Sequence, residues 1–431
     1  MSAIQVTRED VLRFHLGGKI GLHLPKPVRT QQDLCLAYTP GVAQAVKAIA
    51  AEPAMAFDHT ARGKLVAVVT DGTAILGLGD LGPLASIPVM EGKAVLFKSF
   101  GDVDAWPVPL ANMRMGGKAT GPTDPQRVID ATLAIAPMYG GINLEDIAAP
   151  ACFEIEDTLD RLLDIPVFHD DQWGTAVITL AAIQNYLLIA NRNVGDIRVV
   201  INGAGAAGIR IADMCKAAGI TQIILCDSKG PLTNSRTDLN AHKRRHAVDT
   251  NAKTLSDVMR GAHVFIGVSV ANALSADDVK SMADHPAIFA MANPDPEIRP
   301  EAVAEALRGK PYVMATGRSD FVNQINNVLG FPFLFRGALD VRATTINLAM
   351  KTAAAEALAD LARQPATDSV KALYPSENLA FGPAYIIPKP FDSRLLAHVS
   401  LAVSKAAVAS GAAPACDAAV LQKLFDARAK R

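Results

Sequence analysis

The sequence lacks an excess of either charge and has few cysteines. Lys and Arg total 42 against 43 Asp and Glu in 431 residues. This balance excludes the basic surface that nucleic-acid binding requires, so we expect a small-molecule ligand and no nucleic acid. The five cysteines have no paired short spacing, which disfavours a zinc site or a dithiol redox site. Isolated thiols in odd number indicate a reducing, cytoplasmic setting.

Long hydrophobic runs are also missing. No segment approaches the roughly 20 apolar residues of a membrane span, and the charged residues 8–10 do not fit a signal peptide. We therefore expect a cytoplasmic protein without membrane contact. With 50% hydrophobic and 20% charged residues the composition is globular, and the length predicts two or three domains.

What is present is an alternation of strand and helix patterns. Apolar runs at 65–70, 94–97 and 165–168 predict buried strands, and the periodicity of 127–135 and 173–189 predicts helices. Such alternation indicates an α/β fold. We place a domain boundary near residue 171, which gives an N-terminal α/β domain (1–170) and a second domain (171–431). A helical segment after about residue 340 is expected to pack back on either domain.

The second domain carries a glycine motif. Gly203, Gly205 and Gly208 follow a predicted strand and open a predicted helix, and Asp227 ends the next strand, 24 residues after Gly203. This arrangement is typical of the doubly wound Rossmann domain, where the glycines admit a pyrophosphate to the helix N-terminus. The alternative is a glycine turn in another doubly wound fold, such as a methyltransferase.

The sequence leaves the choice between NAD and NADP open. Asp227 is placed to accept hydrogen bonds from a ribose 2′-hydroxyl, which favours NAD. Ser228 and Lys229 follow it directly and could instead meet a 2′-phosphate.

Two pairs of carboxylates lie near the domain boundary. Glu145 and Asp146 are adjacent, and Asp170 and Asp171 are adjacent 25 residues later. Oxygen ligands without Cys or His suggest a site for Mg²⁺ or Mn²⁺. Helix capping by Asp171 is the alternative.

Five further polar side chains are candidates for catalysis or binding. Lys93 opens the predicted strand at 94–97, where burial could lower its pKa enough for it to act as a base, although most lysines are merely exposed. Tyr38 precedes a Thr-Pro-Gly turn and could donate a proton, or simply pack by its ring. Asn293 and the pair Asn326 and Asn327 follow later strands, where they could bind ligand groups or form turns.

Taken in order, these segments resemble the malic enzymes, and among them the small bacterial type. The resemblance covers nearly the whole chain, without the phosphotransacetylase-like C-terminal domain that many small bacterial relatives carry. The matching segments are 37–42, 70–82, 91–97, 140–146, 167–175, the glycine turn at 203–208, 291–298 and 316–339.

The resemblance implies oxidative decarboxylation of (S)-malate to pyruvate and CO₂, with reduction of NAD(P)⁺. It makes Tyr38 the proton donor and Lys93 the general base, with Asp170 orienting the lysine or the metal shell. The residues it assigns to ligands are Glu145, Asp146 and Asp171 for the metal, Asn293 and Asn327 for substrate and nicotinamide, and Gly203, Ala204, Gly205, Ala206, Ala207 and Gly208 for the pyrophosphate.

The resemblance also favours NADP, because small malic enzymes of this type often use it. It implies a homodimer or a higher homo-oligomer, in which Tyr38 and Lys93 reach the site of the neighbouring subunit. The segment 1–42 is too short to form a core and must dock elsewhere, which agrees with that arrangement.

At two places the sequence departs from the family pattern, so the family's residue roles cannot be assigned there. Larger malic enzymes carry an arginine for a substrate carboxylate before the Ile-Leu-Gly-Leu-Gly stretch, whereas this chain has Thr73 and Ala74 before Ile75. The region 106–125 is longer than expected and could be a lid, an interface loop or an insertion. Rival functions are another NAD(P)-dependent dehydrogenase, which would need no metal, and a non-catalytic nucleotide sensor, which would not need Tyr38, Lys93 and three carboxylates together.

Overall fold

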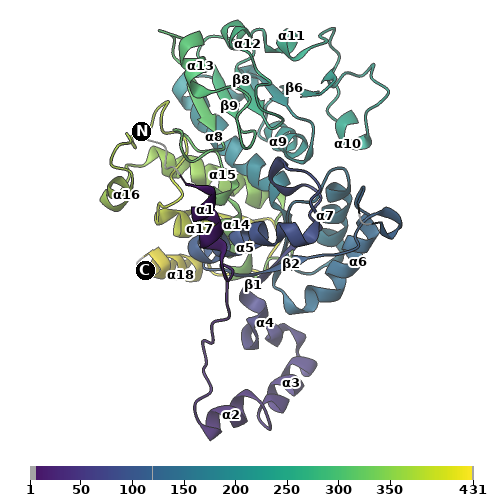
Figure 1. Ribbon diagram of the computed structural model, residues 1–431. Helices are drawn as coiled ribbons and strands as arrows, with labels where there is room; N and C mark the ends of the chain where they lie inside the picture. The colour runs from purple at the N-terminus through teal and green to yellow at the C-terminus, as the bar shows by residue number, and fades with distance from the viewer. Residues whose placement is uncertain (1–5, 119, 430–431) are drawn as a thin grey trace.

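The computed structural model describes residues 6–118 and 120–429 and contains two parallel sheets flanked by helices (Figure 1). The first sheet has the order β2-β1-β3-β4, and all its pairings are parallel. Its strands are β1 (Leu65–Thr70), β2 (Asp104–Pro109), β3 (Gly141–Leu144) and β4 (Val167–His169).

The second sheet has the order β10-β9-β8-β5-β6-β7, with only the short β7 antiparallel. Strand order reverses direction beside β5, as in doubly wound folds. The α/β fold class with a Rossmann-type domain is thus confirmed. The strands are β5 (Arg198–Asn202), β6 (Gln222–Asp227), β7 (Gly230–Pro231), β8 (Val264–Gly267), β9 (Ala287–Ala290) and β10 (Val313–Thr316).

Helices cover both sheets and join them. Those of the first half are α1 (Arg8–His15), α2 (Gln31–Ala37), α3 (Val42–Ala51), α4 (Ala56–His59), α5 (Gly82–Gly101), α6 (Pro125–Ile135), α7 (Ala151–Leu162) and α8 (Thr175–Ala190). Those around the second sheet are α9 (Ala206–Ala217), α10 (Ala241–Arg244), α11 (Leu255–Met259), α12 (Ala276–Ser281) and α13 (Pro300–Ala306).

The C-terminal helices pack back on both halves. Helix α14 packs against α5, α15 packs against α8, and α17 packs against both α14 and α15. This layer binds the first sheet to the helix that leads into the second, as expected. The helices are α14 (Phe331–Asp340), α15 (Leu348–Arg363), α16 (Asp368–Leu373), α17 (Arg394–Ala409) and α18 (Ala418–Ala429).

The predicted strand at 94–97 is wrong, because these residues lie inside the 20-residue helix α5. Met90, Lys93, Ala94, Phe97 and Gly101 are buried, at the spacing of three and four residues that marks one helix face. A short apolar run cannot be assigned to strand or helix by periodicity alone.

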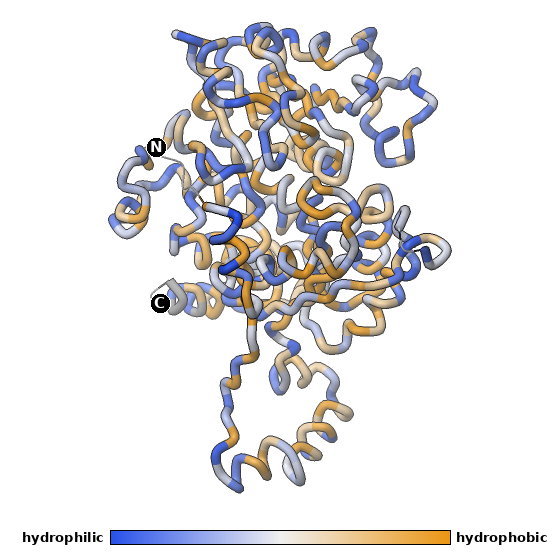
Figure 2. Tube along the Cα trace, in the orientation of Figure 1, coloured by the Kyte–Doolittle hydropathy of each residue, from blue (hydrophilic) through white to orange (hydrophobic). Residues whose placement is uncertain are grey.

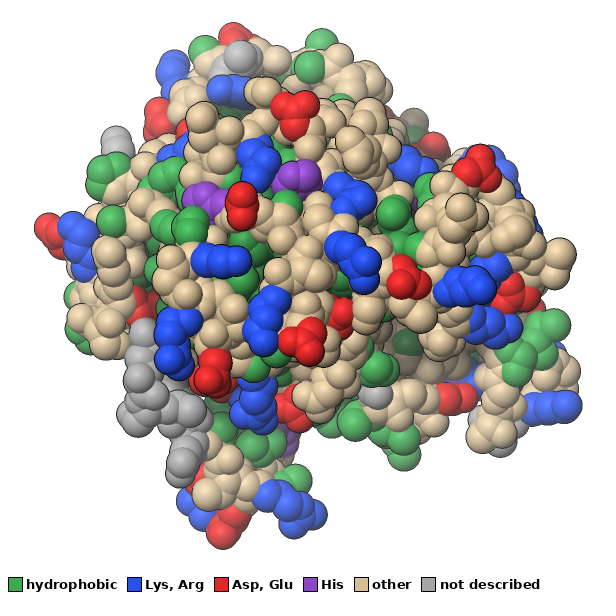
Figure 3. Space-filling model, turned by 90° about the horizontal axis from the view of Figure 1, so that it is seen from above, with side chains coloured by type: hydrophobic (Ala, Val, Ile, Leu, Met, Phe, Trp, Pro, Cys, Tyr) green, Lys and Arg blue, Asp and Glu red, His purple; other side chains and the backbone are tan. Residues whose placement is uncertain are grey.

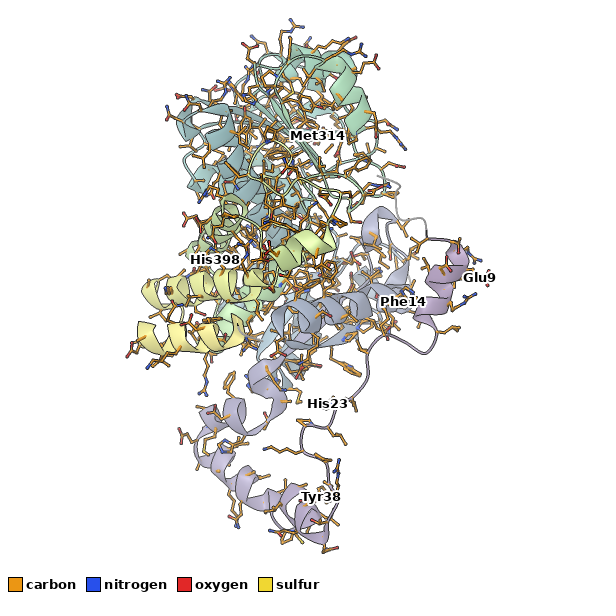
Figure 4. The ribbon with its side chains drawn as sticks, turned by 90° about the vertical axis from the view of Figure 1, so that its left-hand side faces the viewer. Glu9, Phe14, His23, Tyr38, Met314 and His398 are labelled. Carbon is orange, nitrogen blue, oxygen red and sulfur yellow. The ribbon has the colours of Figure 1, made fainter. Side chains whose placement is uncertain are left out.

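Helices α2 and α3 form an arm that projects from the rest of the chain (Figures 1 and 4). Neither helix buries a residue, although both carry apolar residues among polar ones (Figure 2). By length and hydropathy, the stretch Gln31–Ala51 would qualify as a membrane span, as would Asp170–Ala190, which is 67% buried in the core. Two such stretches are weak evidence for a membrane span, because a buried core helix passes the same test.

Charges of both signs are interspersed on the face of the second domain seen from above (Figure 3). This face presents no single-signed surface for a polyanion.

Candidate active site

Two adjacent strands bring the predicted carboxylates to one edge of the first sheet. Strand β3 leads into Glu145 and Asp146, and β4 leads into Asp170 and Asp171. The strands are parallel and pair Leu144 with His169, so their carboxyl ends coincide. Glu145, Asp146 and Asp171 can each offer an oxygen within 4.8 Å of the others.

Two hydrogen bonds hold the carboxylates of this cluster in place. The Asp146 N–H donates to Asp171 Oδ2 over 2.8 Å, and the Asn143 side chain donates to Glu145 Oε2 over 2.9 Å. Asp146 has a φ of 54°, a left-handed conformation that few residues adopt without external support. The Asp171 carboxylate therefore serves the neighbouring loop and caps no helix, because the helical run from Asp170 begins without a side-chain cap.

The cluster is electrostatically suited to a divalent cation. Burial and the neighbouring carboxylate Asp171 raise the pKa of Asp146 to about 7, and burial raises the pKa of Glu145 well above its usual range. Asp146 Oδ2 is buried without a hydrogen-bond partner among the described residues. Carboxylates that repel one another, with one buried oxygen left without a partner, fit Mg²⁺ or Mn²⁺.

Lys93 reaches the same edge from helix α5. Its Nζ lies 2.6 Å from Asp170 Oδ2 and 2.9 Å from Glu145 Oε1, and 4.4 Å from the centre of the Phe331 ring. Burial disfavours the ammonium, but the charges of Asp170, Glu145 and Asp171 outweigh it and raise the pKa of Lys93. The expectation of a lowered pKa is wrong for this state of the protein.

The resemblance implies that Lys93 reaches the site of a neighbouring subunit, and its contacts in the structure differ from that expectation. Its two carboxylate partners belong to its own chain, so Lys93 completes its own subunit's cluster and does not serve a neighbour's.

Asp170 joins Lys93 to the opposite side of the site. It is fully buried, and its Oδ2 also accepts a hydrogen bond from the Asn327 side chain. Gly174 permits this approach, because a Cβ there would lie 2.0 Å from Asp170 Oδ1 and 3.0 Å from the Asn327 Cβ. Asn327 begins a 3₁₀ turn capped by the Asn326 side chain, so the pair of asparagines divides into one local cap and one site residue.

Tyr38 does not join this cluster within the chain. It ends helix α2, its side chain is 68% exposed, and it lies at the far end of the arm (Figure 4).

A cavity of about 580 Å³ lies over the carboxyl end of the second sheet. Gly203 has a φ of 122°, and a Cβ at Gly208 would lie 1.8 Å from the Gly203 carbonyl oxygen, so both positions require glycine. Helix α9 begins at Ala206 directly behind the turn, which provides the N-terminal backbone N–H groups that bind phosphate. The residues lining the cavity include Gly203, Ala204, Gly205, Asp227, Ser228, His242, Lys243, Leu255, Val270 and, from the first domain, Phe153.

Two cations hold Asp227 at the rim of this cavity. Arg236 donates to both carboxylate oxygens over 2.8 and 3.0 Å, and Lys243 donates to Oδ2 over 2.8 Å. Burial would raise the Asp227 pKa, but these hydrogen bonds lower it to about 2. Lys229 points elsewhere: its ammonium pairs with Asp238 over 2.8 Å and its side chain is 67% exposed.

Asn293 follows strand β9, on the same edge of the sheet. It precedes Pro294 through a cis peptide bond and lies near Gly317, at the end of β10. It does not line the nucleotide cavity.

Sequence reasoning missed four residues that the fold brings to these sites. Phe331 lies under Lys93, Arg236 and Lys243 hold Asp227, and Arg114 is buried in the long region at 106–125. Lys243 has a local signal in the sequence, since it begins the run Lys-Arg-Arg, but such a run is typical of a solvated surface.

Comparison with known proteins identifies both halves of the chain. Residues 18–160 match the family model described as malic enzyme, N-terminal domain, and residues 173–380 match malic enzyme, NAD binding domain.

Individual relatives agree. The NADP-dependent malic enzyme of Rhizobium meliloti is 53% identical over 95% of this chain and 53% of its own length, and that of Halomonas elongata is 49% identical over 94% of both. The chain thus spans about half the length of the first relative and nearly all of the second. The crystal structure of a malic enzyme from Pyrococcus horikoshii superposes with a TM-score of 0.87 and 37% identity, covering 98% of this chain and 96% of that one.

Proposed function

The chain belongs to the malic enzyme family, and on that premise we propose that it catalyses the oxidative decarboxylation of (S)-malate to pyruvate and CO₂ with reduction of NADP⁺. One observation carries the proposal: the buried Lys93 ammonium contacts Asp170 and Glu145 beside two further carboxylates. A dehydrogenase without a metal, or a nucleotide sensor, has no use for this cluster.

Glu145, Asp146 and Asp171 would hold a divalent cation. Their mutual repulsion and the partnerless Asp146 Oδ2 support this assignment. When bound, the cation supplies Lewis-acid stabilisation of negative charge on the substrate oxygen.

Lys93 would accept the proton of the C2 hydroxyl while hydride leaves C2. To do so it must first be neutral, although the surrounding carboxylates hold its proton in the free protein. A cation held by Glu145 and Asp171 would offset two of these charges and weaken the attraction, with Asp170 left as the anionic partner of Lys93. Asp170 would orient the ammonium from 2.6 Å, while Asn327 holds Asp170. Asn293 would contact the nicotinamide from the end of strand β9, a role that rests on the family resemblance.

Tyr38 would protonate C3 of enolpyruvate in the site of a second subunit. Its exposed position, and two arm helices that carry apolar residues but bury none of them, support docking on another copy of this chain. The resulting assembly would be a homodimer or a higher homo-oligomer built from dimers. Each active site would take Lys93 and the carboxylates from one chain and Tyr38 from the other.

NADP⁺ is favoured over NAD⁺ by the charges around Asp227. Arg236 and Lys243 already occupy its carboxylate oxygens, which weakens its use as an acceptor for a ribose hydroxyl. Lys243 and Ser228 line the cavity there and could bind a 2′-phosphate. The named specificity of the two bacterial relatives agrees with this choice.

The test is to follow reduced cofactor after mixing the protein with (S)-malate, Mn²⁺ and NADP⁺. Reduction that requires all three additions supports the proposal. Equal reduction in the presence of excess chelator would reject it in favour of a metal-independent dehydrogenase. The division into domains at residue 171 and a cytoplasmic location remain part of the proposal.

A further inference from the structure

The long region after β2 carries a buried arginine that binds two carboxylates. Arg114 is 3% exposed; its guanidinium donates to Asp71 Oδ2 over 3.0 Å and to the two oxygens of Asp80 over 2.6 and 3.2 Å. It also donates to the Asp71 carbonyl over 3.2 Å. Both aspartates belong to the loop between β1 and α5, so one side chain clamps both ends of that loop.

The same region supplies a second contact to Asp71. Arg114 and Thr123 form an isolated backbone bridge, which places them side by side, and the Thr123 hydroxyl donates to Asp71 Oδ2 over 2.6 Å. The other oxygen, Asp71 Oδ1, accepts from the N–H and the hydroxyl of Thr73 over 3.1 and 2.6 Å. All four bonds are internal, because Asp71 is fully buried.

Thr73 and Ala74, which follow Asp71, contact the loop at 145–148 that carries the candidate metal ligands Glu145 and Asp146. The Ala148 N–H donates to the Thr73 hydroxyl over 2.9 Å, and the Ala74 N–H donates to the Asp146 carbonyl over 3.0 Å. These two bonds hold the backbone on both sides of Ile147, next to the left-handed φ of Asp146. Hydrogen bonds and the peptide bond between Thr73 and Ala74 therefore connect Arg114 to the candidate ligand Asp146.

We infer that Arg114 is a positioning residue for the metal site, and that the long region at 106–125 is present in this chain to hold the ligand loop from outside. The inference rests on the proposed function, because it requires that Glu145, Asp146 and Asp171 bind the cation. Asp71 and Asp80 take four of the five guanidinium N–H donors of Arg114, through Nε, Nη1 and Nη2, so the side chain is committed to the loop.

Positioning and simple electrostatics predict opposite results for Arg114→Ala. Removal of a positive charge makes the surroundings more negative, which would tighten binding of a cation. Loss of the clamp instead frees the loop that holds Asp146, which would weaken binding. Substitution of groups that orient metal ligands typically costs 10- to 100-fold in metal affinity.

The experiment measures the dissociation constant of Mn²⁺ by electron paramagnetic resonance in the full-length protein without substrate, and that of NADP⁺ by fluorescence. Arg114→Ala should weaken Mn²⁺ by about tenfold or more and weaken NADP⁺ less, because the second domain lines most of the nucleotide cavity and only Ala149, Pro150 and Phe153 come from the first. Thr123→Val, which removes only one bond to Asp71, should weaken Mn²⁺ less and in the same direction. Arg127→Ala is the matched control. Arg127 contacts the long region at 106–125 through Asp124 and Asn112, and neither contact involves Asp71.

Unchanged or tighter Mn²⁺ binding in Arg114→Ala would overturn the inference, as would parallel losses of Mn²⁺ and NADP⁺ affinity, which indicate general damage. If Arg114→Ala does not fold, Thr123→Val decides by the same criteria. A wild-type protein that binds no Mn²⁺ would overturn the proposed function together with this inference, whereas normal wild-type binding with unaffected variants would overturn only the inference.

Discussion

The ammonium of Lys93 lies 2.6 Å from Asp170 Oδ2, and both side chains are buried at the edge of the first sheet. Helix α5 and strand β4 supply them from positions 77 residues apart. A lysine held in this way is fixed in place and surrounded by the charges that decide its protonation.

Lys93→Ala should reduce malate oxidation by about 100-fold to 10,000-fold, the range typical of a general base. NADP⁺ affinity should stay unchanged, because the glycine turn lies on the other sheet. The measurements are the rate of NADP⁺ reduction and fluorescence titration of the nucleotide. Lys98→Ala, an exposed lysine on the same helix, is the control. Near-wild-type turnover by Lys93→Ala would remove the lysine from the mechanism.

Lys243→Gln should weaken NADP⁺ by about tenfold or more, because a hydrogen bond between charged groups contributes roughly 1.5–3 kcal/mol. NAD⁺, which has no 2′-phosphate, should bind about as before. Lys229→Gln is the matched control, since that lysine pairs with Asp238 away from the cavity. The ratio of kcat/KM for the two cofactors reports the effect, and an unchanged ratio in Lys243→Gln would contradict the assignment.

A composite active site predicts complementation between two inactive variants. Tyr38→Phe and Asp171→Asn should each be inactive alone, and heterodimers formed by subunit exchange should regain one intact site of two. Activity of purified, differently tagged heterodimers is the measurement. Heterodimers without recovered activity would show that Tyr38 and Asp171 serve one chain's site.

Lys351 predicts a stability effect that depends on pH. It is buried on α15, with Nζ 3.7 Å from the centre of the Trp173 ring, and burial lowers its pKa to about 8, although Glu156 opposes the shift. Since the unfolded pKa is 10.5, the folded state carries a cost for the charged lysine below about pH 8. That cost is relieved as pH rises from about 8 toward 10.5, and its full size is on the order of 3 kcal/mol.

The free energy of unfolding of the wild type, relative to Lys351→Met, should therefore increase between pH 7.5 and 9.5. Urea unfolding at both pH values measures it, with the exposed Lys371→Met as control. A difference that does not change with pH would show that Lys351 is not destabilised by burial.

Local patterns were sufficient for the features that depend on neighbouring residues. The glycine turn at 203–208 and the carboxylates after β3 and β4 could be located because strand ends and turn residues are local signals. The helix α5 was mistaken for a strand at 94–97, because an apolar run four residues long has no distinguishing period.

Contacts between distant segments were beyond such patterns. Lys243 meets Asp227 only because the polar segment between them folds back on the sheet, and Arg114 meets Asp71 only through the long region after β2. The arm shows a different limit: Tyr38 is exposed at its far end, away from the carboxylate cluster, and its proposed partners on a second subunit leave no local signal in the sequence.

Isotopic labelling tests the central claim most directly. The protein is supplied with (S)-malate labelled with ¹³C at C4, NADP⁺ and Mn²⁺, and the products are quantified by NMR and absorbance. The account predicts labelled CO₂, unlabelled pyruvate and NADPH in equal amounts, and none of them after removal of the metal by chelation. Formation of NADPH with labelled oxaloacetate and no CO₂, or equal product formation without metal, would contradict it.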